Sequence, residues 1–72
     1  MRYIVNPGDF RDVIVTEDKE EFTRLCEEHK EQGVFYRVSG KRLEKLYKDL
    51  GGGWYPVERY QVQIKVLEAA FP

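Results

Sequence analysis

The sequence predicts a small two-layer α+β domain, in which one mostly antiparallel four-stranded sheet carries two helices packed on one face. Three observations support this fold class: short β-branched and aromatic runs, two segments with apolar residues at helical spacing, and a long alternating segment near the C-terminus. Their order along the 72 residues is ββαβαβ. With 42% apolar and 35% charged residues and no repeat or linker, residues 1–72 are expected to fold as a single compact domain.

The N-terminal segment is predicted to be an antiparallel hairpin. Residues 2–5 and 12–15 are β-branched runs that suit strands. Between them, Pro7 and Gly8 indicate a type II turn, because proline fixes one φ and glycine supplies the positive φ that the next position needs. The first two strands should therefore be neighbours in the sheet.

A helix is predicted over residues 17–32. Thr16 is a suitable N-cap, and the acidic residues that follow it complement the positive end of the helix dipole. Gly33 is expected to end the helix. The apolar stripe, at i, i+3, i+4 and i+7, consists of Phe22, Leu25, Cys26 and His29. This spacing gives the helix one face that can pack on the sheet.

A strand and a second helix are predicted in the middle of the chain. Residues 34–38 are β-branched and aromatic, so they suit a strand. Ser39 can cap a helix that ends at Gly51. The apolar stripe of this helix would consist of Leu43, Leu46, Tyr47 and Leu50. The basic residues of the same segment would then lie on its outer side.

The last strand is predicted over residues 58–69, where apolar and polar residues alternate. The residues facing the core would be Tyr60, Val62, Ile64 and Val66, while Gln61, Gln63 and Lys65 would face solvent. This strand is much longer than the first two, so its overhang would leave backbone groups unpaired. Pairing with a second copy, which gives a homodimer through the C-terminal strand, would satisfy those groups.

Catalysis and cofactor binding are not expected from this sequence. A chain of this size has little room for a substrate pocket beside its core, and no nucleophile, base and orienting group stand at a catalytic spacing. Cys26 and His29 share a helical face, but a zinc site would need two further ligands, and the chain has one Cys and one His. A buried thiol beside a histidine at the rim of the core is the expected arrangement. No metal and no cofactor is predicted.

The chain is expected to be cytoplasmic and to have no membrane partner. Its single cysteine cannot form an internal disulfide, which favours a reducing compartment. No stretch approaches the ~20 apolar residues that span a bilayer, and the N-terminus lacks the layout of a signal peptide.

The best candidates for binding another protein are Trp54, Tyr55 and Arg59. The run GGGWYP follows the predicted second helix, and its glycines are expected to make a flexible turn. Trp and Tyr dominate many protein interfaces, so an aromatic pair on this loop would anchor a partner. The alternative is that Trp54 folds back as a lid on the core.

A second candidate site is a set of basic residues in the middle of the chain. Basic side chains interleaved with aromatic ones can neutralise phosphates and stack bases. The candidate contacts to an anion or a nucleic acid are Arg37, Lys41, Arg42, Lys45 and Lys48. The alternative is that these residues only solvate the outer face of a helix. A net charge of −1 and the lack of an RRM or KH motif count against nucleic acid.

The sequence therefore favours a small protein–protein interaction module that acts as an adaptor, a regulator or an inhibitor of a larger protein. It combines an acidic first helix, a basic second helix and an aromatic loop with no catalytic groups. Free-standing domains of this kind suit phage or mobile-element proteins that block a host machine. The alternative is a nucleic-acid-binding accessory protein that uses the basic second helix.

Overall fold

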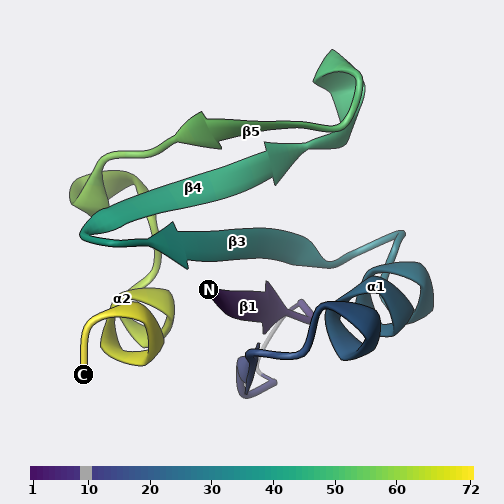
Figure 1. Ribbon diagram of the computed structural model, residues 1–72, viewed down its shortest axis with the longest axis horizontal. Helices are drawn as coiled ribbons and strands as arrows, with labels where there is room; N and C mark the ends of the chain where they lie inside the picture. The colour runs from purple at the N-terminus through teal and green to yellow at the C-terminus, as the bar shows by residue number, and fades with distance from the viewer. Residues whose placement is uncertain (9–10) are drawn as a thin grey trace.

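The computed structural model describes residues 1–8 and 11–72, which form one antiparallel sheet and two α-helices (Figure 1). The sheet has the strand order β2-β1-β3-β4-β5. Its strands are β1 (Arg2–Asn6), β2 (Ile14–Thr16), β3 (Val34–Ser39), β4 (Arg42–Tyr47) and β5 (Gly53–Pro56). The helices are α1 (Lys19–Glu28) and α2 (Ile64–Ala70), and the 3₁₀ turns η1 (Lys48–Leu50) and η2 (Arg59–Gln61) flank β5. The predicted α+β class is confirmed, with five strands in place of four.

The two helices lie on opposite faces of the sheet. Successive residues of a strand point to opposite faces, and on β1 they meet different helices. Tyr3 stacks on Phe22 of α1, with 4.3 Å between the ring centroids. Its neighbour Ile4 belongs to the buried cluster that holds Val66 and Ala70 of α2. The prediction that both helices share one face is therefore wrong, and the molecule has three layers.

Each face of the sheet has its own buried cluster. The residues buried on the α1 side are Val5, Phe22, Leu25 and Phe35. The residues buried on the α2 side are Ile4, Tyr36, Leu43, Val66 and Ala70. Because β1 and β3 contribute to both clusters, these strands need apolar residues at consecutive positions rather than at alternate ones.

The N-terminal hairpin forms as predicted, with shifted ends. β1 and β2 pair in antiparallel fashion, and β2 begins at Ile14 rather than at residue 12. Gly8 has the positive φ, 105°, that the predicted type II turn requires, and its N–H donates to Asn6 Oδ1 at 3.1 Å. The fourth residue of that turn, Asp9, lies outside the described residues.

Helix α1 begins later than predicted because Asp18, not Thr16, is its N-cap. The Asp18 carboxylate accepts the N–H of Glu20 at 3.0 Å, while the hydroxyl of Thr16 accepts the N–H of Asp18 at 3.1 Å. The helix ends at Glu28. Gly33 closes the turn that follows by donating its N–H to the carbonyl of His29 at 2.7 Å.

The segment predicted as the second helix is instead β4, which a two-residue turn joins to β3. Ser39 pairs with Arg42, and Gly40 between them has a φ of 63°, the conformation that tight hairpin turns need at this position. The leucines that suggested a helix fall on opposite faces: Leu43 packs on the α2 side and Leu46 on the α1 side. Helical spacing misled because a strand buried on both faces carries apolar residues at odd and even positions alike.

The segment predicted as the last strand is instead η2 and α2. Alternation from Tyr60 to Val66 suggested a strand, but Val66 and Ala70 are buried against the sheet at the i, i+4 spacing of a helix. The guanidinium of Arg2 donates to the carbonyls of Ala69 (3.3 Å) and Ala70 (3.1 Å), which the end of α2 leaves unpaired. The predicted C-terminal strand is therefore wrong, so the described chain has no such strand through which a homodimer could pair, and its sheet edges are β2 and β5.

Candidate interaction surface

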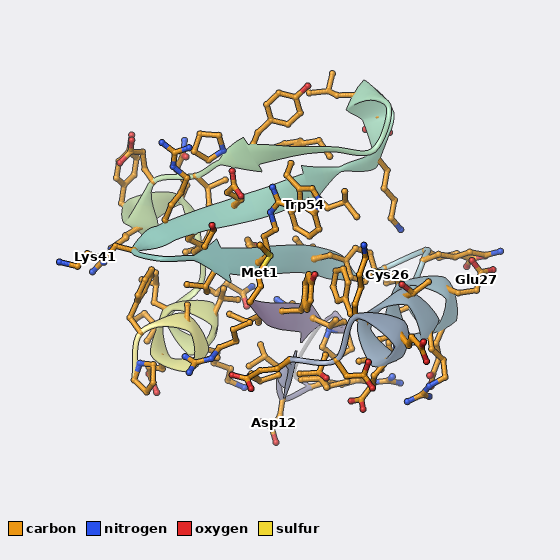
Figure 2. The ribbon with its side chains drawn as sticks, viewed as in Figure 1. Met1, Asp12, Cys26, Glu27, Lys41 and Trp54 are labelled. Atoms are coloured by element: carbon orange, nitrogen blue, oxygen red, sulfur yellow. The ribbon has the colours of Figure 1, made fainter. Side chains whose placement is uncertain are left out.

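The predicted aromatic anchor is part of a strand rather than of a loop. Trp54 and Tyr55 are consecutive residues of β5, so their side chains point to opposite faces of the sheet. The Trp54 ring packs at 5.9 Å from the ring of Phe22, over the α1 side of the sheet (Figure 2). The Tyr55 ring lies over Gly53 and meets Tyr47 edge-on at 5.5 Å. Trp54 therefore has a packing role, and the two aromatic residues do not form a shared anchor.

Arg37 is neutralised within the fold. Its Nε donates to Glu44 Oε1 at 2.7 Å, across the β3–β4 pair. Its guanidinium also covers the Trp54 ring, with Cζ 4.5 Å from the ring centroid. Glu44 is buried, so this ion pair is shielded from solvent on one side. Arg37 is thus engaged with a carboxylate and a ring, and it is poorly placed for an external anion.

Two of the predicted basic contacts pack on opposite parts of the molecule. Lys45 faces the α2 side of the sheet, where its Nζ lies 5.0 Å above the Tyr47 ring. Lys48 donates to the carbonyl of Lys30 at 2.6 Å and covers the ring of Phe35. Since the last turn of α1 carries no basic residue, Lys48 supplies the cation that a helix C-terminus favours. The five predicted basic residues therefore do not share one face.

The structure does bring three other cations to one end of the sheet. Lys41 lies in the turn between β3 and β4, Arg42 is the first residue of β4, and Figure 2 shows Lys41 pointing away from the sheet. The N–H of Val57 donates to the carbonyl of Leu43 at 3.0 Å, so the chain after β5 runs beside β4 toward that turn. Arg59, which follows, is thereby placed at the same end.

Two apolar side chains near this end are exposed to solvent. Tyr60 in η2 is 84% exposed, and Ile64, the first residue of α2, is 71% exposed. Along α2, Ile64, Leu67 and Phe71 follow one line at i, i+3 and i+7. Arg59 stacks on this line, with its Cζ 4.1 Å above the Phe71 ring. We call Arg59, Tyr60, Ile64, Leu67 and Phe71, together with Lys41 and Arg42 at the adjoining end of the sheet, the C-terminal surface. Leu67 and Phe71 are half-buried and also pack against the core cluster on the α2 side.

The sequence prediction included the three cations of the C-terminal surface but missed its apolar residues. Tyr60 and Ile64 were expected to face the core, because alternation placed them on the inner side of a strand. The i, i+3, i+7 spacing of Ile64, Leu67 and Phe71 is a helical signal that could have found them. Arg59 links both groups.

Cys26 on α1 is half-buried and packs against the cluster on the α1 side, and His29, the C-cap of α1, is also half-buried. Burial raises the pKa of the Cys26 thiol, and the nearby charge of Lys48 opposes this shift. Within residues 1–8 and 11–72, His, Cys, Asp and Glu side chains do not gather in threes as a metal site requires. The arrangement matches a structural thiol more closely than a reactive one.

Charge is divided between the two parts of the chain. Residues 1–33 hold nine acidic and five basic residues, whereas residues 34–72 hold four acidic and seven basic ones. The first part includes α1, and the second includes β3, β4, β5 and α2. The C-terminal surface therefore belongs to a part of net charge +3, although the whole chain has a net charge of −1.

Comparisons of this chain with models of protein families, with curated protein sequences and with solved structures find no match. In the part of the chain that is described, the helices are also too short or too polar to cross a membrane. The function has to be inferred from the residues of the surface.

Proposed function

We propose that the protein is a small interaction module that binds a larger protein through the C-terminal surface and acts on it as an adaptor, a regulator or an inhibitor. The observation that carries the proposal is the exposure of Tyr60 and Ile64 within four residues of each other. Burying one such side chain against a partner is favourable by about 1.5–3 kcal/mol. Neither side chain contributes to the buried core of the domain.

The composition of the surface also suits protein recognition. Tyr and Arg are enriched among the residues that dominate binding energy, and Tyr60 and Arg59 are neighbours here. Ile64 offers an apolar contact from a helix that the sheet holds in place, and the uncovered parts of the half-buried Leu67 and Phe71 extend it. Apolar residues bordered by charged ones are the usual arrangement of a protein interface.

Affinity capture from nuclease-treated native lysate tests the proposal. The tagged protein should retain at least one protein that Ile64→Lys and Tyr60→Ser variants lose, because each change removes apolar contact area from the surface. The matched control is Leu50→Lys, since Leu50 is equally apolar, is 59% exposed and lies in η1 at another site. Circular dichroism should show an intact fold for all three. Identical capture by the wild type and both surface variants would disprove the proposal.

Trp54→Ala is a poor test of partner binding, because Trp54 packs on Phe22 and under Arg37. Loss of binding in that variant could come from loss of the fold. A change at Tyr55, which packs at the surface, disturbs less of the core. The proposal assigns no catalysis to the protein and a cytoplasmic location; both stay predictions, as does a phage or mobile-element origin.

Nucleic acid is the second candidate partner, and the three cations at one end of the sheet favour it. A polyanion would meet them, but it would also be repelled by the acidic residues of the first part of the chain. Fluorescence anisotropy with a labelled single-stranded oligonucleotide would decide. Binding that weakens steeply with salt would support this candidate, and no change in anisotropy at low ionic strength would remove it.

A further inference from the structure

We infer that the partner of the C-terminal surface is acidic: it presents Asp or Glu side chains around apolar anchors. This inference rests on the proposed function and adds the chemistry of the partner. Its basis is that the C-terminal surface combines a few apolar side chains with three cations that form no ion pair with a described carboxylate. The three cations are Lys41, Arg42 and Arg59.

The ion pairs of the described residues all involve other cations. They are Arg24–Glu28, Lys30–Glu27, Arg37–Glu44 and Lys65–Asp12. Lys41, Arg42 and Arg59 are exposed, and no described carboxylate lies within ion-pair distance of them. A neutral or basic partner would desolvate these charges without compensation, whereas an acidic one would pair with them.

Glu58 is the one acidic residue placed beside these cations, and it has a structural task. Its carboxylate accepts the N–H of Gln61, while its own N–H donates to Gln61 Oε1 at 3.1 Å. This reciprocal cap orders η2, the element that carries Arg59 and Tyr60. Farther along α2, Lys65 pairs with Asp12 at 3.8 Å and Glu68 is exposed, so Glu58 and Glu68 are two acidic residues against the three cations. The surface therefore keeps a net positive charge.

The apolar residues of the surface determine which apolar side chains the partner must present next to its acidic residues. Phe71 is already covered on one side by Arg59, at 4.1 Å from the ring. Ile64 and Tyr60 remain open. A partner segment can place an aliphatic or aromatic side chain against Ile64 and a carboxylate beside the stacked Arg59 guanidinium, which can donate two parallel N–H hydrogen bonds to the carboxylate oxygens. Charge and apolar contact thus select the same segment.

Panning a randomised peptide library displayed on phage against the full chain tests this inference. Peptides retained by the wild type should be rich in Asp and Glu next to Leu, Ile, Phe or Trp. The same library panned on the triple variant Lys41→Glu/Arg42→Glu/Arg59→Glu should return peptides rich in Lys and Arg. A synthetic peptide selected on the wild type should bind the triple variant about tenfold more weakly.

Control variants separate this inference from the proposed function. The matched charge control is Lys19→Glu, an exposed cation on α1 outside the surface, and it should leave peptide selection unchanged. If the selected peptides need Ile64 for binding, but those selected on the wild type and on the triple variant have the same net charge, the acidic partner is refuted. The proposed interaction module is not affected by that result. Tight retention of a labelled single-stranded oligonucleotide, lost in the triple variant, would overturn it in favour of nucleic acid. The outcome of lysate capture with Ile64→Lys decides the proposed function independently.

Discussion

Replacing Arg37 by methionine is predicted to destabilise the fold strongly, although this residue is a charged one on a partly solvated strand. In the wild type its Nε donates to Glu44 Oε1 at 2.7 Å and its guanidinium covers Trp54. The Glu44 side chain is only 11% exposed. In the variant, that carboxylate has no cation to pair with and little access to water.

The expected loss follows from the burial of the pair. Removing one partner of a buried ion pair costs about 3–5 kcal/mol, and the 28% exposure of the Arg37 side chain places this pair at the low end, about 3 kcal/mol. A domain of 72 residues has a free energy of unfolding of roughly 4–11 kcal/mol, so this loss is a large share. The melting temperature should fall by roughly 12–24 °C. Adding Glu44→Leu should restore much of the loss, because no charge then stays buried.

Urea unfolding followed by circular dichroism measures this change, with the fluorescence of Trp54, the single tryptophan, as a second probe. The matched control is Arg24→Met. Arg24 pairs with Glu28 at 3.5 Å, but their side chains are 67% and 56% exposed, so the expected loss is below about 0.5 kcal/mol. Equal losses for Arg37→Met and Arg24→Met, or no recovery in the double variant, would refute the reasoning.

Three further predictions concern positions away from this ion pair. Gly33→Ala should lower the free energy of unfolding by about 2–3 kcal/mol, because its new Cβ would lie 2.5 Å from the His29 carbonyl oxygen. Thermal denaturation measures the loss, with Gly40→Ala as the control, because there the new Cβ meets no atom and only the φ of 63° is strained, at about 1 kcal/mol. A loss for Gly33→Ala no larger than that for Gly40→Ala would contradict the prediction. Burial raises the pKa of the Cys26 thiol above 9.0, so iodoacetamide should alkylate the folded protein more slowly than a free cysteine at neutral pH; stability should also fall as the pH rises past 9.0, because the unfolded thiol ionises first. Lys48→Met should weaken the C-terminal turn of α1 by roughly 0.5–1 kcal/mol, which would speed up amide hydrogen exchange in that turn. An exchange profile identical to that of the wild type would contradict this prediction.

Local signals are sufficient to predict the first half of the fold. The strands β1, β2 and β3 and the helix α1 have the expected type and order, because turn residues, an acidic helix start and one apolar stripe all agree there. The ends differ: β2 begins at Ile14, and α1 runs from Lys19 to Glu28 with Asp18 in place of Thr16 as its N-cap. Both residues are good caps, and in the structure the Thr16 hydroxyl accepts the N–H of Asp18, while Asp18 caps the helix.

The second half could not be predicted because its patterns fit two structures equally well. Leucines at 43 and 46 suit one face of a helix, and they also suit the two faces of a strand that is covered on both sides. Ser39-Gly40 is compatible with a helix cap and with a hairpin turn. The information that separates these possibilities lies outside the segment: residues far away in the chain cover both faces of β4.

The candidate site shows the same division. Lys41, Arg42 and Arg59 are recognisable in the sequence as exposed cations, but their common position depends on β5 running back along β4. The exposure of Tyr60 and Ile64 depends on the segment being helical. As a strand it would have turned both inward.

By itself, the sequence determined the size, the α+β class, the lack of a recognisable catalytic motif, and the presence of cations and aromatic residues that can meet a partner. Tertiary structure alone decided that Trp54 packs against Phe22, that Arg37 is paired, and that Ile64 and Tyr60 are exposed in the same part of the described chain as three unpaired cations. The physical reason is that side-chain spacing specifies which residues can share a face, while only the packing of distant segments specifies which faces are covered.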